Sequence, residues 1–216
     1  MPVKKIFWDN PYLTQVTARI TSINGDIITL DQTVAYAFSG GQQSDVGTIG
    51  GYAIIKAEKI NQEIFYTLDS ARGLSEGCEV SVSIDWEKRY RIMKLHFAAE
   101  IILELLYQNF DRPEKIGANI TTEKARLDFC WSGNISSAFP LLEAKAADLI
   151  RDNRIIISAF SNEETEERYW EITGFARVPC GGTHLKKTGE VGNIKLKRVN
   201  LGGGKERIEI YLAAEK

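Results

Sequence analysis

The chain has only two histidines, and each lies near another side chain that can bind a metal ion. Glu100 follows His96 by four residues, so the two side chains project from the same face of a helix. A carboxylate on this largely apolar face is costly unless it is paired or bound to a cation. Cys180 precedes His184 by four residues. The two glycines between them allow a loop tight enough for both side chains to reach one point.

These four side chains offer one thiolate, two imidazoles and one carboxylate, which is a donor set that zinc accepts. If fewer than four of them bind, the open position can hold a water molecule whose pKa zinc lowers to about 7. Such a site makes hydroxide available at neutral pH. The alternative is a core histidine that is paired with a glutamate and holds no metal.

Composition limits the class of protein. A chain of 216 residues suffices for one large or two small domains, and 44% hydrophobic with 26% charged residues is ordinary for a globular protein. No apolar run approaches the roughly 20 residues that cross a bilayer. Met1–Lys5 lacks the apolar stretch that follows the lysines of a secretory signal. We therefore expect a cytoplasmic protein with no membrane partner, and its oligomeric state stays open.

Charge and cysteines are unevenly placed. The net charge of −2 by itself speaks against a nucleic-acid partner. From Arg177 to Lys216, however, nine Lys or Arg stand against four Asp or Glu. This segment can form a basic surface, and a solvated hairpin is the alternative. The other two cysteines, Cys78 and Cys130, are expected to be small buried residues, because their wide spacing argues against a disulfide framework.

Residues 1–84 are predicted to form a small β-barrel-like domain. Short β-branched runs alternate there with glycine-containing turns, which is typical of barrels and sandwiches. The expected strands are Thr14–Ile23, Asp26–Leu30, Gly51–Ala57, Glu63–Leu68 and Glu79–Ile84.

Residues 85–216 are predicted to form an α+β sandwich, with helices on one face of a mostly antiparallel sheet. The expected helices are Asp85–Gln108 with Asp85 as N-cap, Pro140–Asp152 ended by Asn153, and a short helix capped by Ser161 and Glu164. The expected strands are Lys124–Trp131, Ile155–Phe160, Tyr169–Val178, Val191–Val199 and Arg207–Leu212.

Several stretches resemble the editing domains of alanyl-tRNA synthetases, which also occur as free-standing AlaX proteins. The most specific is Cys180-Gly-Gly-Thr-His184, followed by Lys187-Thr-Gly-Glu-Val-Gly192. The run Thr33–Gly47 resembles the family's Gly-Gly-Gln segment, and Arg91–Leu106 occupies the place of its His-containing helix. The resemblance covers nearly the whole chain, and its length fits the medium-sized type. It implies trans-editing, the hydrolysis of serine or glycine wrongly attached to the alanine-specific tRNA, with mischarged tRNA as partner.

The resemblance also implies the metal ligands. The family holds zinc with His-x-x-x-His from the helix and Cys-x-x-x-His from the loop. Carried over by position, this implies one Zn²⁺ per chain, bound by His96, Glu100, Cys180 and His184. Glu100 stands where the family usually has a second histidine, so it is either a ligand through oxygen or a general base beside three other ligands. Asn119 and Ala37 also depart from the family, which often has histidine and proline there.

Residues for catalysis and substrate binding follow from the same resemblance. Gln42 and the backbone amides of Gly40 and Gly41 are candidates for holding the ester or the terminal ribose. Thr33 is a candidate for pairing with the serine hydroxyl, since a site that pairs a hydroxyl rejects a methyl group far better than an apolar pocket does. Together with Glu100, Gln42 and Thr33 are the catalytic candidates. The other candidates for contacting tRNA are Thr183, which can instead satisfy loop backbone groups, and Lys186, Lys187, Lys195, Lys197 and Arg198.

Two other functions stay open. The chain could be a zinc hydrolase that acts on another aminoacyl-tRNA or on a small acylated molecule, and the departures at Glu100 and Asn119 leave room for this. It could also be a non-catalytic tRNA-binding module, because four protein ligands fit a closed structural site.

Overall fold

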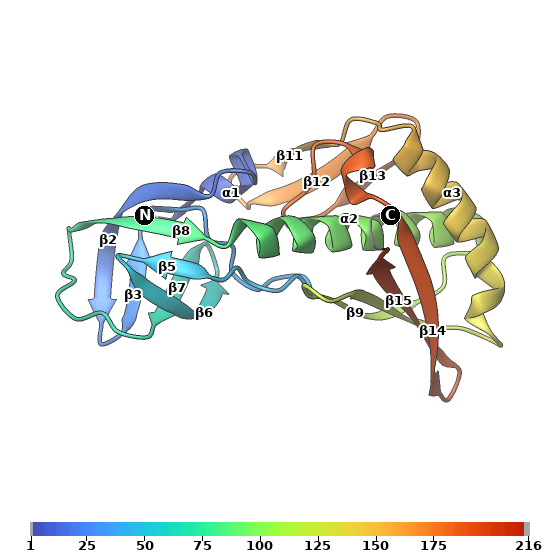
Figure 1. The fold of residues 1–216 in the computed structure, drawn as a ribbon, viewed down its shortest axis with the longest axis horizontal. Coiled ribbons are helices and arrows are strands. Elements are labelled where there is room, and N and C mark those ends of the chain that lie inside the picture. The colour runs from blue at the N-terminus through green and yellow to red at the C-terminus, as the bar shows by residue number, and fades with distance from the viewer. Residues whose placement is uncertain (1, 214–216) are drawn as a thin grey trace. The chain divides into compact units, whose positions relative to one another are not determined.

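The computed structural model describes residues 2–213, which form two compact units (Figure 1). The first holds the described residues up to Ser39 together with Gln43–Arg91. The second holds Gly40–Gln42 together with the described residues from Ile92 onward. No helix within residues 2–213 is long and apolar enough to cross a membrane.

The first unit is built from short strands. Six of them pair in the closed order β2-β3-β7-β6-β5-β8 and so form a closed barrel. Side chains of β7 and β8 alternate between buried and more exposed positions, which places every second residue in the barrel core. The elements are β1 (Lys4–Lys5), α1 (Ile6–Asp9), β2 (Gln15–Asn24), β3 (Ile27–Leu30), β4 (Gln32–Thr33), β5 (Gly47–Ile49), β6 (Tyr52–Ile60), β7 (Glu63–Leu68) and β8 (Glu79–Ile84).

A buried ion pair braces the first unit. The guanidinium of Arg89 is fully buried and donates to both carboxylate oxygens of Asp45. Asp45 also accepts from the backbone N–H of Tyr36 at 2.6 Å, and Arg89 donates to the carbonyl of Val34 at 2.7 Å. Each charge therefore has its partners inside the unit, as a buried ion requires.

Replacing Asp45 by alanine should lower the free energy of unfolding by about 3–5 kcal/mol, because the guanidinium of Arg89 would stay buried without its counter-ion. Denaturant unfolding measures the change. Lys56→Ala is the control: its ion pair with Glu58 joins side chains that are 61% and 48% exposed, and such pairs contribute roughly 0–1 kcal/mol. Equal losses in the two variants would contradict a bracing role for Asp45.

The second unit contains two antiparallel sheets, one ordered β14-β15-β10-β9 and the other β11-β12-β13. This mixture of strands and helices agrees with the predicted α+β class. Its elements are the last part of α2 (Trp86–Asn109), β9 (Lys115–Ile120), β10 (Ala125–Cys130), the 3-10 helix Ile135–Ala138, α3 (Phe139–Arg151), β11 (Ile157–Asn162), β12 (Glu167–Ile172), β13 (Ala176–Pro179), the 3-10 helix Thr188–Val191, β14 (Ile194–Gly202) and β15 (Lys205–Leu212).

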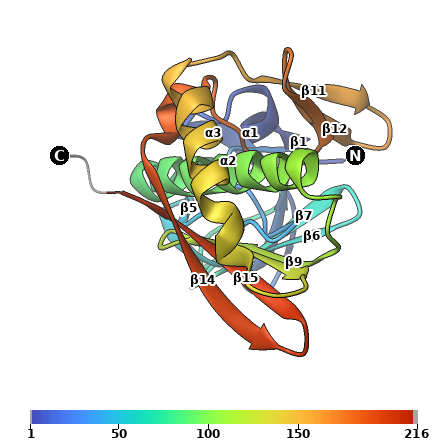
Figure 2. The same ribbon diagram turned by 90° about the vertical axis from the view of Figure 1, so that its right-hand side faces the viewer.

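The part of α2 from Ile92 onward runs between the two sheets (Figures 1 and 2). Asp85 caps the helix as predicted, since its carboxylate accepts from the backbone N–H of Lys88 at 3.1 Å. The sequence predicts one apolar face, but Met93, Phe97 and Ile101 on other faces are fully buried as well. A helix that is apolar nearly all round is one that packs on several sides. This burial fixes the side chains of α2 that carry the site.

Four sequence predictions are wrong: a hydrogen-bonded turn explains the first of them, and the positive φ of a glycine explains the second. Ser161 and Glu164 cap no helix; the side chain of Asn162 accepts from the backbone N–H groups of Glu164 and Thr165 and turns β11 into β12. The predicted strand Tyr169–Val178 is two strands, β12 and β13, that pair antiparallel on either side of Gly174, whose φ is 75°. Cys78 is exposed and Cys130 is only partly buried, whereas both are predicted to be buried. The second helix is confirmed, and Asn153 ends it with φ of 50°.

Candidate metal centre

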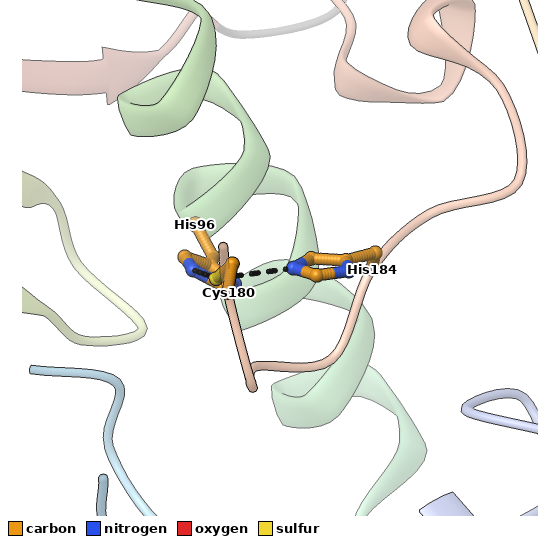
Figure 3. Close-up of side chains that lie close together, drawn as sticks. All are labelled: His96, Cys180 and His184. Carbon is orange, nitrogen blue, oxygen red and sulfur yellow. Dashed lines mark hydrogen bonds between the residues drawn. The ribbon is translucent and has the colours of Figure 1, made fainter. Parts of the chain in front are cut away.

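His96, Cys180 and His184 bring one potential ligand atom each to within 4.8 Å of one another (Figure 3). His96 comes from the buried part of α2, and Cys180 follows β13 directly. The Cys180 sulfur lies 3.5 Å from Nε2 of His96 and 3.3 Å from Nε2 of His184. The backbone N–H of Cys180 donates to the carbonyl of Arg168 at 2.8 Å and so anchors this end of the loop to β12.

Each imidazole is held by its other nitrogen. Nδ1 of His184 lies 2.9 Å from the hydroxyl of Ser158 on β11, and Nδ1 of His96 lies 3.3 Å from the carbonyl of Thr183. Both rings therefore present Nε2 to the cluster. This is the arrangement by which proteins orient metal-binding histidines. Sequence reasoning missed Ser158, because no local spacing marks a serine on another strand.

Glu100 lies beside the other three side chains. Its Oε1 is 3.4 Å from Nε2 of His96 and 3.6 Å from the Cys180 sulfur. Its Oε2 accepts from the indole N–H of Trp170 at 3.0 Å. Trp170 is fully buried, and its indole N–H fixes one oxygen of the carboxylate. The other oxygen remains directed at His96 and Cys180.

Three of these side chains are placed as ligands of one metal ion. Bonds of about 2.3 Å to sulfur and about 2.0–2.1 Å to nitrogen or oxygen, at tetrahedral angles, separate neighbouring zinc ligands by roughly 3.4–3.6 Å. The Cys180 sulfur lies 3.3 and 3.5 Å from the nitrogens of His184 and His96, and the ligand atoms of all three residues lie within 4.8 Å of one another. Glu100 lies 3.4 Å from His96 and 3.6 Å from the sulfur but is not part of this group of three. His96, Cys180 and His184 therefore fit zinc, with Glu100 beside them.

Electrostatics around the cluster point the same way. Burial opposes charge on His96, but Cys180 and Glu100 outweigh it and hold the pKa of His96 well above its usual value. Burial likewise opposes charge on Glu100, but hydrogen bonds from His96 and Trp170 lower its pKa to about 2. Burial and the nearby charge of His96 lower the pKa of His184 to about 3. Cys180 and Glu100 therefore favour a cation at the centre of the cluster. The imidazole of His184 stays neutral and is able to bind a metal ion.

Gln42 and Gly182 hold the loop of residues 180–184, here called the metal loop, in place. The buried amide of Gln42 donates to the hydroxyl of Thr183 at 2.9 Å and accepts from its backbone N–H at 3.1 Å. Gly182 packs against His96: a Cβ there would lie 2.1 Å from Cε1 of His96. Gly41 passes so near β9 that its Cβ would lie 2.8 Å from the carbonyl of Ala118. The Gly-Gly-Gln segment is therefore packed against the loop and β9 within the second unit.

Gln42→Ala should loosen this loop. The backbone N–H of Thr183 and its hydroxyl would lose their partner, at a cost of roughly 1–3 kcal/mol for buried groups. We expect lower thermal stability and roughly 10–100-fold weaker zinc binding, the range for residues that orient ligands. Competition with a chromophoric chelator measures the affinity. Gln42→Glu is the matched variant, since it retains the acceptor for the Thr183 N–H. Wild-type affinity in Gln42→Ala would contradict the positioning role.

Of the other predicted site residues, Thr33 lies in the first unit and the lysines and Arg198 lie in the second. Thr33 is fully buried in the first unit, where its hydroxyl lies 2.8 Å from that of Tyr66 and accepts from the backbone N–H of Ala35. Its predicted role toward a serine hydroxyl stays a prediction. Lys186, Lys187, Lys195 and Lys197 are exposed. The guanidinium of Arg198 donates twice to Glu206, at 2.6 Å each, so a carboxylate already neutralises it.

Comparison with known proteins gives the family. Residues 171–209, which include the metal loop, match the family described as Threonyl and Alanyl tRNA synthetase second additional domain. The chain is 30% identical to the alanyl-tRNA editing protein AlaX-M of Pyrococcus horikoshii, over 97% of each chain. It is 30% identical to AlaX-M of Methanosarcina mazei, over 91% of this chain and 90% of that one. It is also 32% identical to the alanine–tRNA ligase of Ignicoccus hospitalis, of which it covers 24%.

An α+β protein with this cluster and these full-length relatives is of the aminoacyl-tRNA editing class. The chain belongs to the AlaX-M family of alanyl-tRNA editing proteins. The family that the sequence resemblance indicated is thereby confirmed.

Proposed function

We propose that this protein is a trans-editing hydrolase that removes serine or glycine from mischarged tRNA of alanine identity with the help of one zinc ion. One observation supports this most strongly: His96, Cys180 and His184 converge as potential ligands of one metal ion, with Glu100 beside them, in a chain whose full-length relatives are alanyl-tRNA editing proteins. Deacylation of such a tRNA breaks the ester bond between the amino acid and the terminal ribose, with water as the nucleophile.

His96, Glu100, Cys180 and His184 would hold the zinc. When bound, zinc supplies Lewis acidity toward the substrate or the attacking water. The ester is labile, so the chain has mainly to position it and to stabilise the developing oxyanion. We assign this task to the backbone N–H groups of Gly40 and Gly41, while Gln42 holds the metal loop through Thr183.

Glu100 serves in this proposal as the fourth ligand. The distances from its Oε1 to His96 and Cys180 are those of neighbouring zinc ligands. Its Oε2 accepts a hydrogen bond from the indole N–H of Trp170. A general base would need a free oxygen directed at water. Thr33 for the serine hydroxyl, and Thr183, Lys186, Lys187, Lys195, Lys197 and Arg198 for the tRNA, complete the proposed substrate contacts.

The test is a deacylation panel with zinc-loaded protein. We expect release of serine from tRNA of alanine identity at least 100-fold faster than release of alanine, because a site that pairs the serine hydroxyl can reject a substrate without it by as much as roughly 10⁴–10⁵. Glycine carries no hydroxyl, and its release is measured beside that of alanine. Ser-tRNA of serine identity and an unrelated aminoacyl-tRNA are the controls. Equal rates on all of them, or none on any, would overturn the proposal.

One observation favours a second candidate. With Glu100 as a fourth ligand beside His96, Cys180 and His184, the cluster also matches a closed structural site. The protein would then bind tRNA without hydrolysing it. Measurable affinity for tRNA with no hydrolysis at any zinc content would favour this candidate, whereas zinc-dependent hydrolysis would exclude it.

A further inference from the structure

The four-stranded sheet of the second unit has one apolar and one charged face. Leu127 and Phe129 of β10 and Ile208 and Ile210 of β15 are buried on the first. The opposite face, here called the outer sheet face, carries six cations. These are Lys124, Arg126, Lys195, Lys197, Lys205 and Arg207.

Strand register places these cations on one face. Lys197 of β14 is the direct partner of Glu209, which in turn pairs with Arg126 of β10. Arg207 of β15 pairs with Asp128. Directly opposed residues of antiparallel strands share a face, as do residues two apart. The cations therefore spread over three neighbouring strands rather than along one.

Two carboxylates of this face are used internally. Asp128 accepts two hydrogen bonds from Arg207, at 2.7 and 2.9 Å, and one from Arg126 at 2.9 Å. Glu209 accepts from Lys124 and from the hydroxyl of Tyr211. Both carboxylates are nearly buried, with side chains 10% and 6% exposed. They hold the long cationic side chains in fixed positions, which lowers the entropy lost when those side chains bind an anion.

A positive excess remains. Six cations against Asp128, Glu209 and, at the edge of the face, Glu114 beside Cys130 leave the outer sheet face at +3, although the whole chain carries −2. Lys195, Lys197 and Lys205 are exposed, and within residues 2–213 Lys195 and Lys197 make no ion pair. The chemistry of the outer sheet face is that of a surface for phosphates.

We propose that the outer sheet face binds the phosphate backbone of a double-stranded RNA stem. The proposal rests on the proposed function, since the substrate there is a tRNA whose amino acid is attached at the end of a stem. An array of cations on three neighbouring strands, three of them (Lys124, Arg126 and Arg207) held by carboxylates, suits the regular backbone of an A-form helix, which proteins recognise by shape and phosphate contacts. Lys195 and Lys197, which are exposed and form no ion pair in the described structure although Lys197 lies opposite Glu209, would provide the strongest contacts.

The test is binding of uncharged tRNA of alanine identity, followed by fluorescence anisotropy over a series of salt concentrations. Lys195→Gln with Lys197→Gln should weaken binding several-fold. It should also reduce the slope of log K against log salt by about 1.4–1.8, because each neutralised phosphate contributes roughly 0.7–0.9. Both lysines are exposed strand residues, and melting temperatures verify that the variant folds.

The matched control removes the same charge elsewhere. Lys56→Gln with Lys88→Gln affects two exposed lysines of the first unit, each in a surface ion pair. It should keep the wild-type slope. Equal slopes in the two double variants would overturn the proposal, as would equally tight binding of a single-stranded RNA of the same length as a stem-loop probe.

The salt-dependence test and the test of the proposed editing function can succeed or fail separately. If the wild-type protein hydrolyses Ser-tRNA but the Lys195/Lys197 variant binds tRNA with the wild-type salt slope, the proposed role of the outer sheet face is wrong and the editing function is supported. If the slope falls as expected but no ester is hydrolysed, RNA binding by the outer sheet face is supported and the proposed editing function is wrong.

Discussion

Replacing Cys180 by alanine should abolish zinc binding and bring deacylation down to the uncatalysed rate. The Cys180 sulfur lies within 3.6 Å of donor atoms from all three of the other proposed ligands. Its loss removes the thiolate and one of the two negative charges of the cluster. We expect zinc affinity to fall by more than about 100-fold, since even residues that only orient ligands contribute roughly 10–100-fold.

Metal content after dialysis against a chelator, measured by mass spectrometry, tests this directly. Cys78→Ala is the control, because Cys78 is an exposed cysteine of the first unit. Its zinc content should equal that of wild type. One full equivalent of zinc in Cys180→Ala would contradict the assignment of the site.

Gly182→Ala should be nearly as damaging, although it adds a single methyl group. That methyl carbon would lie 2.1 Å from Cε1 of His96 and 2.7 Å from Oε1 of Gln42. Either the imidazole of His96 rotates away or the loop moves outward. A ligand set must be held within about 0.5 Å of its working geometry. We therefore expect loss of both zinc binding and deacylation, together with about 1–3 kcal/mol of destabilisation from overpacking.

The neighbouring glycine is a matched control. A Cβ at Gly181 would meet nothing within 4 Å, so Gly181→Ala should bind zinc like wild type. Zinc titration against a competing chelator, combined with thermal melting, compares the two variants. If Gly182→Ala keeps wild-type zinc affinity, close packing of this loop against His96 is not what positions the ligands.

Local sequence patterns predicted the parts of the site that are close in sequence. His96 and Glu100 are four residues apart on one helix, and Cys180 and His184 flank a tight loop, so spacing alone pairs them. That the two pairs meet follows only from the fold. The resemblance supplied that link in the sequence analysis.

The supporting residues could not be predicted in this way. Ser158, Trp170 and Gln42 reach the cluster from other strands and from the Gly-Gly-Gln segment. Their partners are 26, 70 and 141 residues away in sequence, and no periodicity signals such contacts. Sequence reasoning assigned Gln42 to the substrate, whereas in the structure its amide binds Thr183.

The basic C-terminal segment shows the same limit. Counting charges predicts a basic surface and groups Arg198 with Lys195 and Lys197. The structure separates them, because Arg198 is bound by Glu206 while the two lysines lie on the outer sheet face. Lys124 and Arg126, which are distant in sequence, join that face through the pairing of β10 with β15. Strand register therefore decides which cations act together.

The most direct test of the central claim is reconstitution of metal-free protein. Protein stripped with a chelator is mixed with Ser-tRNA of alanine identity, and zinc is added in steps up to and beyond one equivalent. We predict no release of serine without metal, full activity at one equivalent, and no recovery in Cys180→Ala. Full activity of the metal-free protein, or none after zinc is bound, would contradict a zinc-dependent editing site built on His96, Glu100, Cys180 and His184.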